Sequence, residues 1–330
     1  MTDSKSILEQ CFSIKFGSIP HPKATDLYRR LNDQVTVLHR TLPASLQGEA
    51  MLFSLKYAGL HIGDPLDFFK HYYQPVWSVL YWLLNGTGNL KSLPDDLLES
   101  ILCGHAMAMT LHSLDDHLVD GNIPVSHLTL LIRTEAWRRM SEAIDCFCAD
   151  FPGGSELAQS FIDDYYSGIT VQDTPDTLDA YCELFRKQLA TGLIMPLLVA
   201  RKTGGDDAFL SGLRAAIESF GIAWRLLDDI QDLEADMADG THSAVYVCLD
   251  NITRAMWDNL DQGKGQRKDK IMEKICAKVS GEKILETIAA RIVAELDNAA
   301  LLTDGIGLPG LAEEYRVLAG PVREWIRKLL

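Results

Sequence analysis

Apolar residues recur every three or four positions through most of the 330-residue chain, and this spacing constrains its fold more than any other feature. Segments with the alternation of β-strands are scarce, and turn-forming stretches such as "NGTGN" and "DGIGLPG" separate the helical segments. We expect helices at 25–42, 66–84, 95–118, 127–149, 155–170, 176–203, 206–238, 243–261, 267–301 and 310–329, with a kink at Pro196. The pattern predicts one all-α domain over residues 1–330, in which residues 1–23 are an N-terminal extension.

Charge and composition exclude several classes of function. A net charge of −15 argues against nucleic-acid binding, because phosphate backbones are bound by clusters of Lys and Arg. The most apolar stretch, residues 75–84, is too short to span a bilayer, so we expect no stable membrane insertion. Seven scattered cysteines favour reduced thiols and a cytoplasmic location.

Two acidic clusters, about 113 residues apart, each follow an apolar helix. The first is "SLDDHLVDG" at 113–121, which carries Asp115, Asp116 and Asp120. The second is "LLDDIQDLEADMADG" at 226–240, which carries Asp228, Asp229, Asp232 and Asp236. Residues four apart share one face of a helix, so the spacing predicts a carboxylate stripe at the end of each helix.

Carboxylates at a helix C-terminus oppose the macrodipole, and like charges four residues apart repel each other. Both clusters carry this penalty, which a bound cation would offset. Mg²⁺ takes oxygen ligands from one or two carboxylates, from water and from substrate phosphates. Two such clusters facing each other could therefore hold Mg²⁺ against a departing diphosphate. The alternative is two solvated helix ends with no metal, which is the reading that we keep for Glu234 and Asp239.

The sequence resembles the trans-isoprenoid synthase superfamily, which includes prenyl diphosphate synthases and class I terpene synthases. "LLDDIQDLEAD" is similar to the second Asp-rich motif of the prenyl synthases, and "LDDHLVD" resembles the first motif with one extra residue before its last Asp. The resemblance implies a helical bundle around a deep apolar cavity, three Mg²⁺, an isoprenoid diphosphate substrate and a possible homodimer. It also implies metal-binding roles for both clusters, with Asp115, Asp116, Asp228 and Asp229 as the catalytic residues.

Chain-elongating members of that superfamily carry basic residues for a second diphosphate, and this chain departs from them. The corresponding region at 46–63 has one Lys and no Arg, Gly168 is followed by Ile169, and Gly240 is followed by Thr241-His242. These departures favour a class I terpene synthase acting on a single C15–C20 allylic diphosphate. A trans-prenyltransferase, or a non-catalytic helical partner subunit, is the alternative.

Candidates for the rest of the site follow from their positions near the two clusters. For the cavity they are Ala108, Leu111, His112, Phe185 and Trp224, with ordinary helix packing as the alternative. For the diphosphate they are Arg186, Lys187, Arg225 and Arg316, with surface salt bridges as the alternative. Small residues upstream of Asp115, Gly104 among them, would leave the cavity deep.

Overall fold

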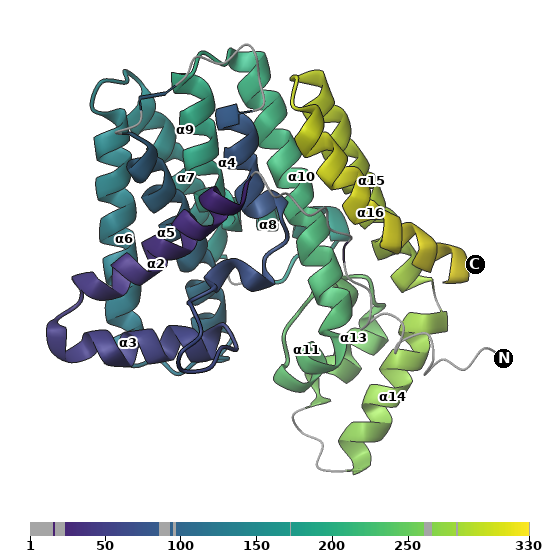
Figure 1. Ribbon diagram of the computed structural model, residues 1–330. Helices are drawn as coiled ribbons and strands as arrows, with labels where there is room; N and C mark the ends of the chain where they lie inside the picture. Colours follow the sequence, from purple (N-terminus) through teal and green to yellow (C-terminus); the bar gives the residue numbers. More distant parts are fainter. Residues whose placement is uncertain are drawn as a thin grey trace.

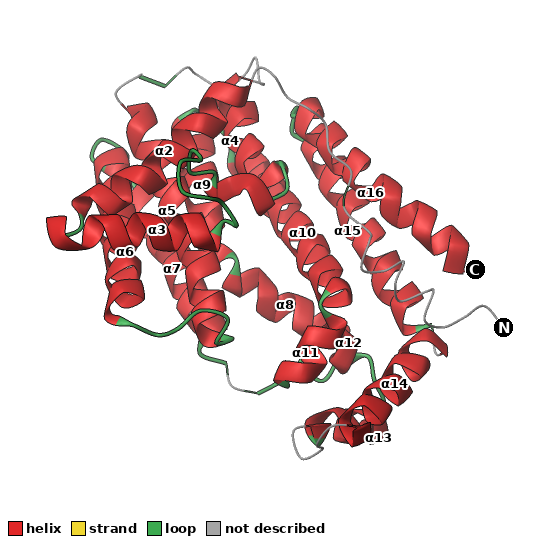
Figure 2. Ribbon diagram, turned by 60° about the horizontal axis from the view of Figure 1, so that its bottom comes forward, coloured by secondary structure: helices red, strands yellow, loops and turns green. Residues whose placement is uncertain are grey.

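The computed structural model describes residues 16, 24–85, 93–94, 97–171, 173–260, 266–281 and 283–329, and within these it contains helices and no strand (Figure 2). The first half of the chain forms α2 (Thr25–Thr41), α3 (Ala44–Tyr57), η2 (Phe68–His71), α4 (Pro75–Asn85), α5 (Leu98–Val119), α6 (His127–Cys148) and α7 (Gly154–Ile169). The second half forms α8 (Leu178–Gln188), η4 (Ala190–Leu193), α9 (Ile194–Lys202), α10 (Asp207–Gln231), α11 (Leu233–Asp239), α12 (Ala244–Val247), α13 (Asn251–Asp258), α14 (Gln266–Gly281), α15 (Ile284–Gly305) and α16 (Pro309–Leu329). The prediction of an all-α fold is confirmed.

The helices that carry the acidic clusters, α5 and α10, belong to two neighbouring groups. Helix α5 packs against α6, α2 and α9, and it is buried along most of its length. Helix α10 packs against α15, which in turn lies along α16 at the other side of the molecule (Figure 1). Both acidic clusters therefore lie at the ends of helices that the core holds in place.

Several predicted helices are interrupted. The helix expected at 66–84 begins only at Pro75, where proline takes the first helical position and needs no hydrogen-bonded N–H. The segment 176–203 breaks at Leu189–Leu193, before Pro196 rather than at it. Pro196 is the third residue of α9, in the first turn of the helix, where its missing N–H is not needed by the helix. The kink predicted at Pro196 is therefore corrected to a short 3₁₀ turn that precedes it.

Three other predicted helices are each divided in two. The breaks fall at Asp232 between α10 and α11, at Cys248–Asp250 between α12 and α13, and between Gly281 and Ile284. At the second break the Asp250 carboxylate caps α13 by accepting the backbone N–H groups of Ile252 and Thr253. Hydrophobic periodicity continues across such breaks, which is why it does not reveal them.

One residue of the predicted N-terminal extension is described in the structure. Phe16, within the predicted extension of residues 1–23, is buried, and its ring packs on Tyr73 with centroids 4.6 Å apart. The rest of that extension lies outside the described residues. No described helix is both long enough and apolar enough to cross a membrane.

Helix α16 approaches α4 so closely that one glycine decides the contact. A Cβ atom at Gly310 would lie 2.1 Å from the Trp82 ring, whereas a Cβ at Gly320, in the same helix, would meet nothing within 4 Å. We expect Gly310→Ala to lower the free energy of unfolding by about 1–3 kcal/mol, because the indole must move. Gly320→Ala should instead raise it by up to about 1 kcal/mol through helix propensity. Urea denaturation of both variants measures the difference, and equal effects would contradict this packing.

Candidate active site

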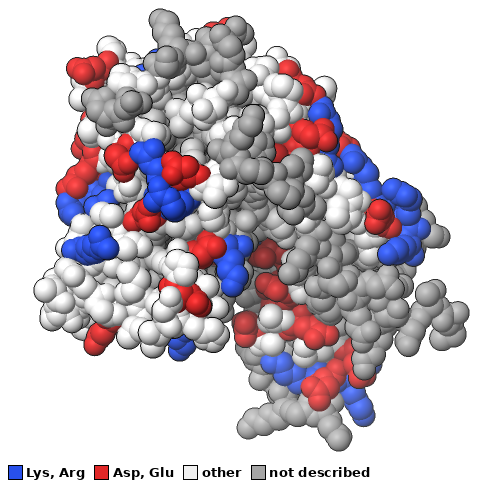
Figure 3. Space-filling view, viewed as in Figure 1, with Lys and Arg blue, Asp and Glu red and all other residues white. Residues whose placement is uncertain are grey.

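One pocket collects residues from both acidic clusters. It has a volume of about 220 Å³ and is lined by Tyr72, His112, Ser113, Asp116, His117, Phe185, Trp224, Arg225 and Asp228; we call it the acidic pocket. Its two carboxylates are Asp116, from the end of α5, and Asp228, from the end of α10, so one member of each cluster faces the same space. The space-filling view shows acidic side chains gathered around a hollow near the middle of one face (Figure 3).

Asp228, Asp232 and Asp236 form the carboxylate stripe of the second cluster. They keep their four-residue spacing although α10 ends at Gln231. The backbone N–H of Asp232 donates to the carbonyl of Asp228 at 2.8 Å, and that of Asp236 donates to the carbonyl of Asp232 at 2.8 Å. Asp228 and Asp236 are half-buried, while Asp232, Glu234 and Asp239 are exposed. The break therefore leaves the three stripe carboxylates on one side of the chain.

Asp229 has a different environment from its neighbours in the stripe. It is 2% exposed, and its carboxylate accepts hydrogen bonds from the Tyr181 hydroxyl at 2.7 Å and from the Ala244 backbone N–H at 2.9 Å. Arg225 Nε lies 2.9 Å from the other carboxylate oxygen of Asp229. Burial raises the pKa of Asp229, and these three donors oppose that rise. A carboxylate so fully bonded holds the wall together and has little capacity left for a metal.

Arg225 connects the two walls. Its guanidinium binds Asp229 on α10, lies 4.0 Å from the Asp116 carboxylate on α5, and sits over the Phe185 ring at 5.8 Å. Of the four basic residues proposed for the diphosphate, Arg225 is the one that lines the acidic pocket. Its guanidinium therefore lies between a carboxylate of α10 and a carboxylate of α5.

The other basic candidates lie farther from this pocket. Arg186 pairs with Glu183 at 3.2 Å, and Lys187 is exposed on α8. Arg316 pairs with Asp304 and Glu313 on the surface of α15 and α16. These are the surface salt bridges that the sequence left open as the alternative for Arg316.

Asp115 is the member of the first cluster that departs most from expectation. Its carboxylate is bound in a bidentate manner by Arg133, with the Arg133 Nη2–Oδ2 distance 2.9 Å, and it also accepts the Tyr165 hydroxyl at 2.6 Å. Arg133 comes from α6 and Tyr165 from α7, and neither lies in a motif. Asp116 and Asp120 are exposed and four residues apart, so they make a better pair of metal ligands than Asp115 does.

Burial, together with nearby carboxylates, raises the pKa values of several Asp side chains in the two clusters. Burial raises the pKa of Asp228 to about 7, with Asp232, Asp229 and Asp116 adding to the rise and Arg225 opposing it. Burial and the charge of Asp229 raise the pKa of Asp236 to about 8. Burial and a neighbouring carboxylate raise the pKa of Asp120, beside Asp116, and of Asp232, beside Asp229. The site therefore has more negative charge than Arg225 can balance.

These residues fit a divalent cation. The Asp236 Oδ2 atom is buried and has no hydrogen-bond partner of good geometry, although the nearby Ser243 hydroxyl lowers the pKa of this carboxyl. An oxygen in that position is costly to bury unless a cation or a proton occupies it. Nevertheless, no three His, Cys, Asp or Glu side chains among the described residues are close enough to form a complete metal cluster by themselves. Water and substrate phosphate oxygens would have to complete the coordination, as is usual for Mg²⁺.

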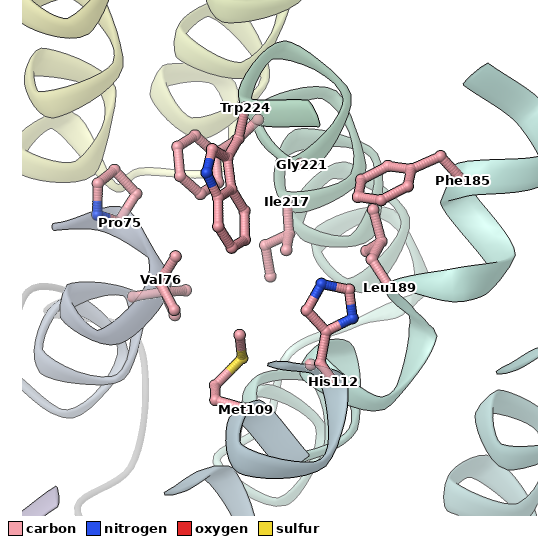
Figure 4. A pocket seen from close by; sticks show the side chains of 12 residues that line it. Pro75, Val76, Met109, His112, Phe185, Leu189, Ile217, Gly221 and Trp224 are labelled. Carbon is pink, nitrogen blue, oxygen red and sulfur yellow. The ribbon is translucent and has the colours of Figure 1, made fainter. Parts of the chain in front are cut away.

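An apolar chamber of about 50 Å³ adjoins the acidic pocket, with which it shares His112, Phe185 and Trp224. These side chains and Met109 project into one space from α5, α8 and α10 (Figure 4). The predicted cavity residues Ala108 and Leu111 are buried in the core and do not line the chamber. The space beside Gly104 is filled by Met195, whose sulfur lies 2.7 Å from the position of a Cβ there. The expectation of a deep cavity beneath Asp115 is therefore wrong, because a side chain from α9 occupies that depth.

Comparison with known proteins finds solved structures with a similar fold. Neither a protein-family model nor a curated protein matches the sequence. Among solved structures, similar chains are a geranylgeranyl pyrophosphate synthase from Corynebacterium glutamicum (14% identity, TM-score 0.58, covering 98% of this chain and 99% of that one) and a polyprenyl synthetase from Streptomyces coelicolor (12%, 0.64, 91% and 99%). A decaprenyl diphosphate synthase from Rhodobacter capsulatus matches similarly (13%, 0.59, 99% and 100%). The chain has the fold of the trans-prenyl diphosphate synthases. This confirms the resemblance at the level of the fold.

The raised pKa of Asp228 predicts how stability depends on pH without metal. An ordinary Asp has a pKa of 3.8, and the pKa of Asp228 in the folded protein is about 7. Between these two pH values, the folded state holds a proton on Asp228 that the unfolded state has lost. Stability should therefore fall as pH rises from about 4 through about 7. Asp228→Asn should raise Tm at pH 8 by several degrees and change it little at pH 4, with about 2–4 °C expected per kcal/mol in domains of 150–250 residues.

Thermal unfolding at pH 4, 6 and 8 with a chelator measures this effect. The exposed Asp239→Asn is the matched control. Added Mg²⁺ should stabilise the wild type more at pH 8 than at pH 6, because only deprotonated carboxylates bind the ion. An equal effect of Asp228→Asn at every pH would contradict the electrostatic account.

Proposed function

We propose that this protein is a Mg²⁺-dependent enzyme that ionises an allylic isoprenoid diphosphate, and that it belongs to the prenyltransferase class. One observation carries the proposal: carboxylates from α5 and α10 face each other across the acidic pocket, with Arg225 between them. The fold shared with named prenyl diphosphate synthases supports the same chemistry.

Each part of the pocket has a role in this reaction. Asp116 and Asp120 on one wall, with Asp228, Asp232 and Asp236 on the other, would hold the Mg²⁺ ions, of which three are expected by resemblance. Bound Mg²⁺ supplies positive charge that stabilises the diphosphate as the C1–O bond breaks. Arg225 binds the diphosphate from the side opposite Asp229. Trp224 and Phe185 exclude water from the allylic cation and present ring faces to it.

Asp115 has a positioning role in this scheme. Its bonds to Arg133 and Tyr165 tie the end of α5 to α6 and α7. Asp116 follows it directly in the chain, so those bonds fix the direction from which Asp116 enters the acidic pocket. The first Asp of the motif thus orients the ligand rather than being one.

A terpene synthase that uses one substrate is the second candidate, and it rests on the lack of basic groups for a second diphosphate. On α3, Lys56 is exposed, and the neighbouring Tyr57 hydroxyl bonds to Ser113. His242 stands near the position where the resemblance places a Lys. It bonds instead to Thr174 at 2.6 Å and to Asp258 at 3.0 Å. The names of the structural neighbours favour transfer over cyclisation, and product analysis separates the two.

We expect the protein to release diphosphate from geranyl, farnesyl or geranylgeranyl diphosphate only when Mg²⁺ is present. Incubation with and without isopentenyl diphosphate, followed by mass spectrometry, identifies the products. A longer prenyl diphosphate would show chain elongation, whereas a hydrocarbon or alcohol from one substrate would show a terpene synthase. Failure to release diphosphate from every substrate would exclude both and favour a non-catalytic partner subunit.

Substitutions inside the acidic pocket and outside it are expected to have different effects on kcat. Asp116→Asn or Asp228→Asn should lower kcat by roughly 10²-fold or more, since each removes a group that acts on the departing charge. Glu234→Gln, an exposed change within the same acidic run, should leave kcat within about twofold. Steady-state assay of diphosphate release at saturating Mg²⁺ compares them. Full activity in Asp228→Asn would rule out the stripe as the metal site.

A further inference from the structure

A short segment after the second acidic cluster makes direct contact with it. Residues 240–243 connect α11 to α12, and we call them the connecting segment. The backbone N–H of Ala244, the first residue of α12, donates to the Asp229 carboxylate at 2.9 Å. The Ser243 side chain is buried, and its hydroxyl lies close enough to Asp236 to lower the pKa of that carboxyl. The position of this segment therefore affects two carboxylates of the second cluster.

His242, in the same segment, makes its contacts with other parts of the chain. Its Nδ1 atom lies 2.6 Å from the Thr174 hydroxyl, and its Nε2 atom lies 3.0 Å from the Asp258 carboxylate. An ionised carboxylate only accepts hydrogen bonds, so Nε2 carries a proton, and Nδ1 is left to accept a hydrogen bond from the Thr174 hydroxyl. Thr174 lies between α7 and α8, and Asp258 is the last residue of α13. One imidazole thus joins three parts of the chain.

Stacking fixes the orientation of this imidazole. Its ring lies on that of Tyr246, with the centroids 3.8 Å apart and the planes 9° from parallel. The Tyr246 hydroxyl donates to the second oxygen of Asp258 at 3.2 Å. The Arg254 guanidinium lies 5.5 Å from the centre of the Tyr246 ring, and it donates to the carbonyl of Asp176, between α7 and α8, at 3.2 Å. We call Thr174, His242, Tyr246 and Asp258 the His242 clasp.

A role in binding diphosphate does not fit His242, although the resemblance places a Lys near this position. Such a role needs a free N–H directed into the acidic pocket, whereas both ring nitrogens of His242 are bonded elsewhere. His242 is also absent from the residues that line the acidic pocket. An ordinary surface ion pair is the other alternative, and such pairs contribute little to stability. The clasp differs from such a pair because the two residues that follow His242 contact the second cluster.

We propose that His242 is a positioning residue for the second acidic cluster. Through the clasp it holds the connecting segment, and the segment holds the Ala244 N–H on Asp229 and the Ser243 hydroxyl beside Asp236. Groups that orient a metal ligand without touching the metal typically change its affinity by about 10–100-fold. Loss of the clasp should therefore weaken the binding of divalent cations and leave the folded core intact. The effect on catalysis rests on the proposed function, but the effect on the segment does not.

Hydrogen exchange followed by NMR measures the effect on the segment directly. The Ala244 N–H is at the start of α12, where no helical carbonyl accepts it, so its protection reports the bond to Asp229. In His242→Ala we expect the Ala244 amide to exchange at least about tenfold faster, while amides in the middle of α10 keep their rates. His242→Gln should restore most of the protection, because its carboxamide can donate to Asp258 and accept from Thr174.

Binding of Mn²⁺ in the presence of inorganic diphosphate, measured by electron paramagnetic resonance, tests the effect on the metal site. His242→Ala should raise the Kd of Mn²⁺ at least about fivefold, and His242→Gln should keep it within about twofold of the wild type. Thr174→Val removes one hydroxyl of the clasp and should shift the Kd in the same direction, which covers the case that His242→Ala folds poorly. His127→Ala, which changes an exposed histidine at the start of α6, is the matched control and should alter neither the Kd nor the exchange.

These measurements separate the inference from the proposed function. If His242→Ala changes neither the exchange at Ala244 nor the Kd of Mn²⁺, or speeds exchange equally throughout the chain, His242 has no positioning role and the inference is wrong. If the wild type releases diphosphate from no isoprenoid substrate, the proposed function is overturned, and faster exchange at Ala244 in His242→Ala would still support the clasp. In an active enzyme, His242→Ala should raise the Mg²⁺ concentration that gives half the maximal rate by about fivefold or more, and keep kcat at saturating Mg²⁺ within about threefold.

Discussion

The pairing of Arg225 with Asp229 is the interaction on which the rest of the site depends. A carboxylate that is 2% exposed is stable only if donors surround it, and Asp229 has the guanidinium, the Tyr181 hydroxyl and the Ala244 N–H. Those donors come from α10, α8 and the start of α12, so one buried charge connects three elements. Helical spacing places Arg225 four residues before Asp229, and its free side then points across the acidic pocket to Asp116.

This arrangement leaves an excess of negative charge in the site. Arg225 is one cation among several carboxylates. The pKa values of Asp228 and Asp236 rise to about 7 and about 8 mainly because both groups are buried, and neighbouring carboxylates add to the rise. An isolated protein relieves the repulsion by keeping protons. A divalent ion relieves it better, because it satisfies buried oxygens such as Asp236 Oδ2 as well as the charge. The proposed binding of Mg²⁺ therefore rests on the charge and burial of these carboxylates rather than on a complete set of ligands among the described residues.

Sequence alone was sufficient for what depends on periodicity. The helical class, the two acidic helix ends and the four-residue stripe all follow from local spacing, and the stripe survives the break at Asp232 because its backbone hydrogen bonds continue. Partners brought by other helices could not be predicted. Arg133 and Tyr165 lie 18 and 50 positions from Asp115, and nothing near Asp115 shows that they will bind it. The pairing of Arg316 with Asp304 could not be predicted for the same reason, since Asp304 is on a neighbouring helix.

The size of the cavity shows why small residues are a weak guide to empty space. Gly104 and Ala108 were expected to leave room beneath Asp115, but a glycine on one helix lets a neighbouring helix approach, and here Met195 takes the space. Packing density is conserved while the shapes of individual side chains vary, so a missing side chain is usually replaced from across the interface. The larger space, of about 520 Å³, is lined instead by residues near the ends of α5 and α7 and the start of α6. Small residues therefore indicate where neighbouring helices approach each other, and they do not by themselves predict a cavity.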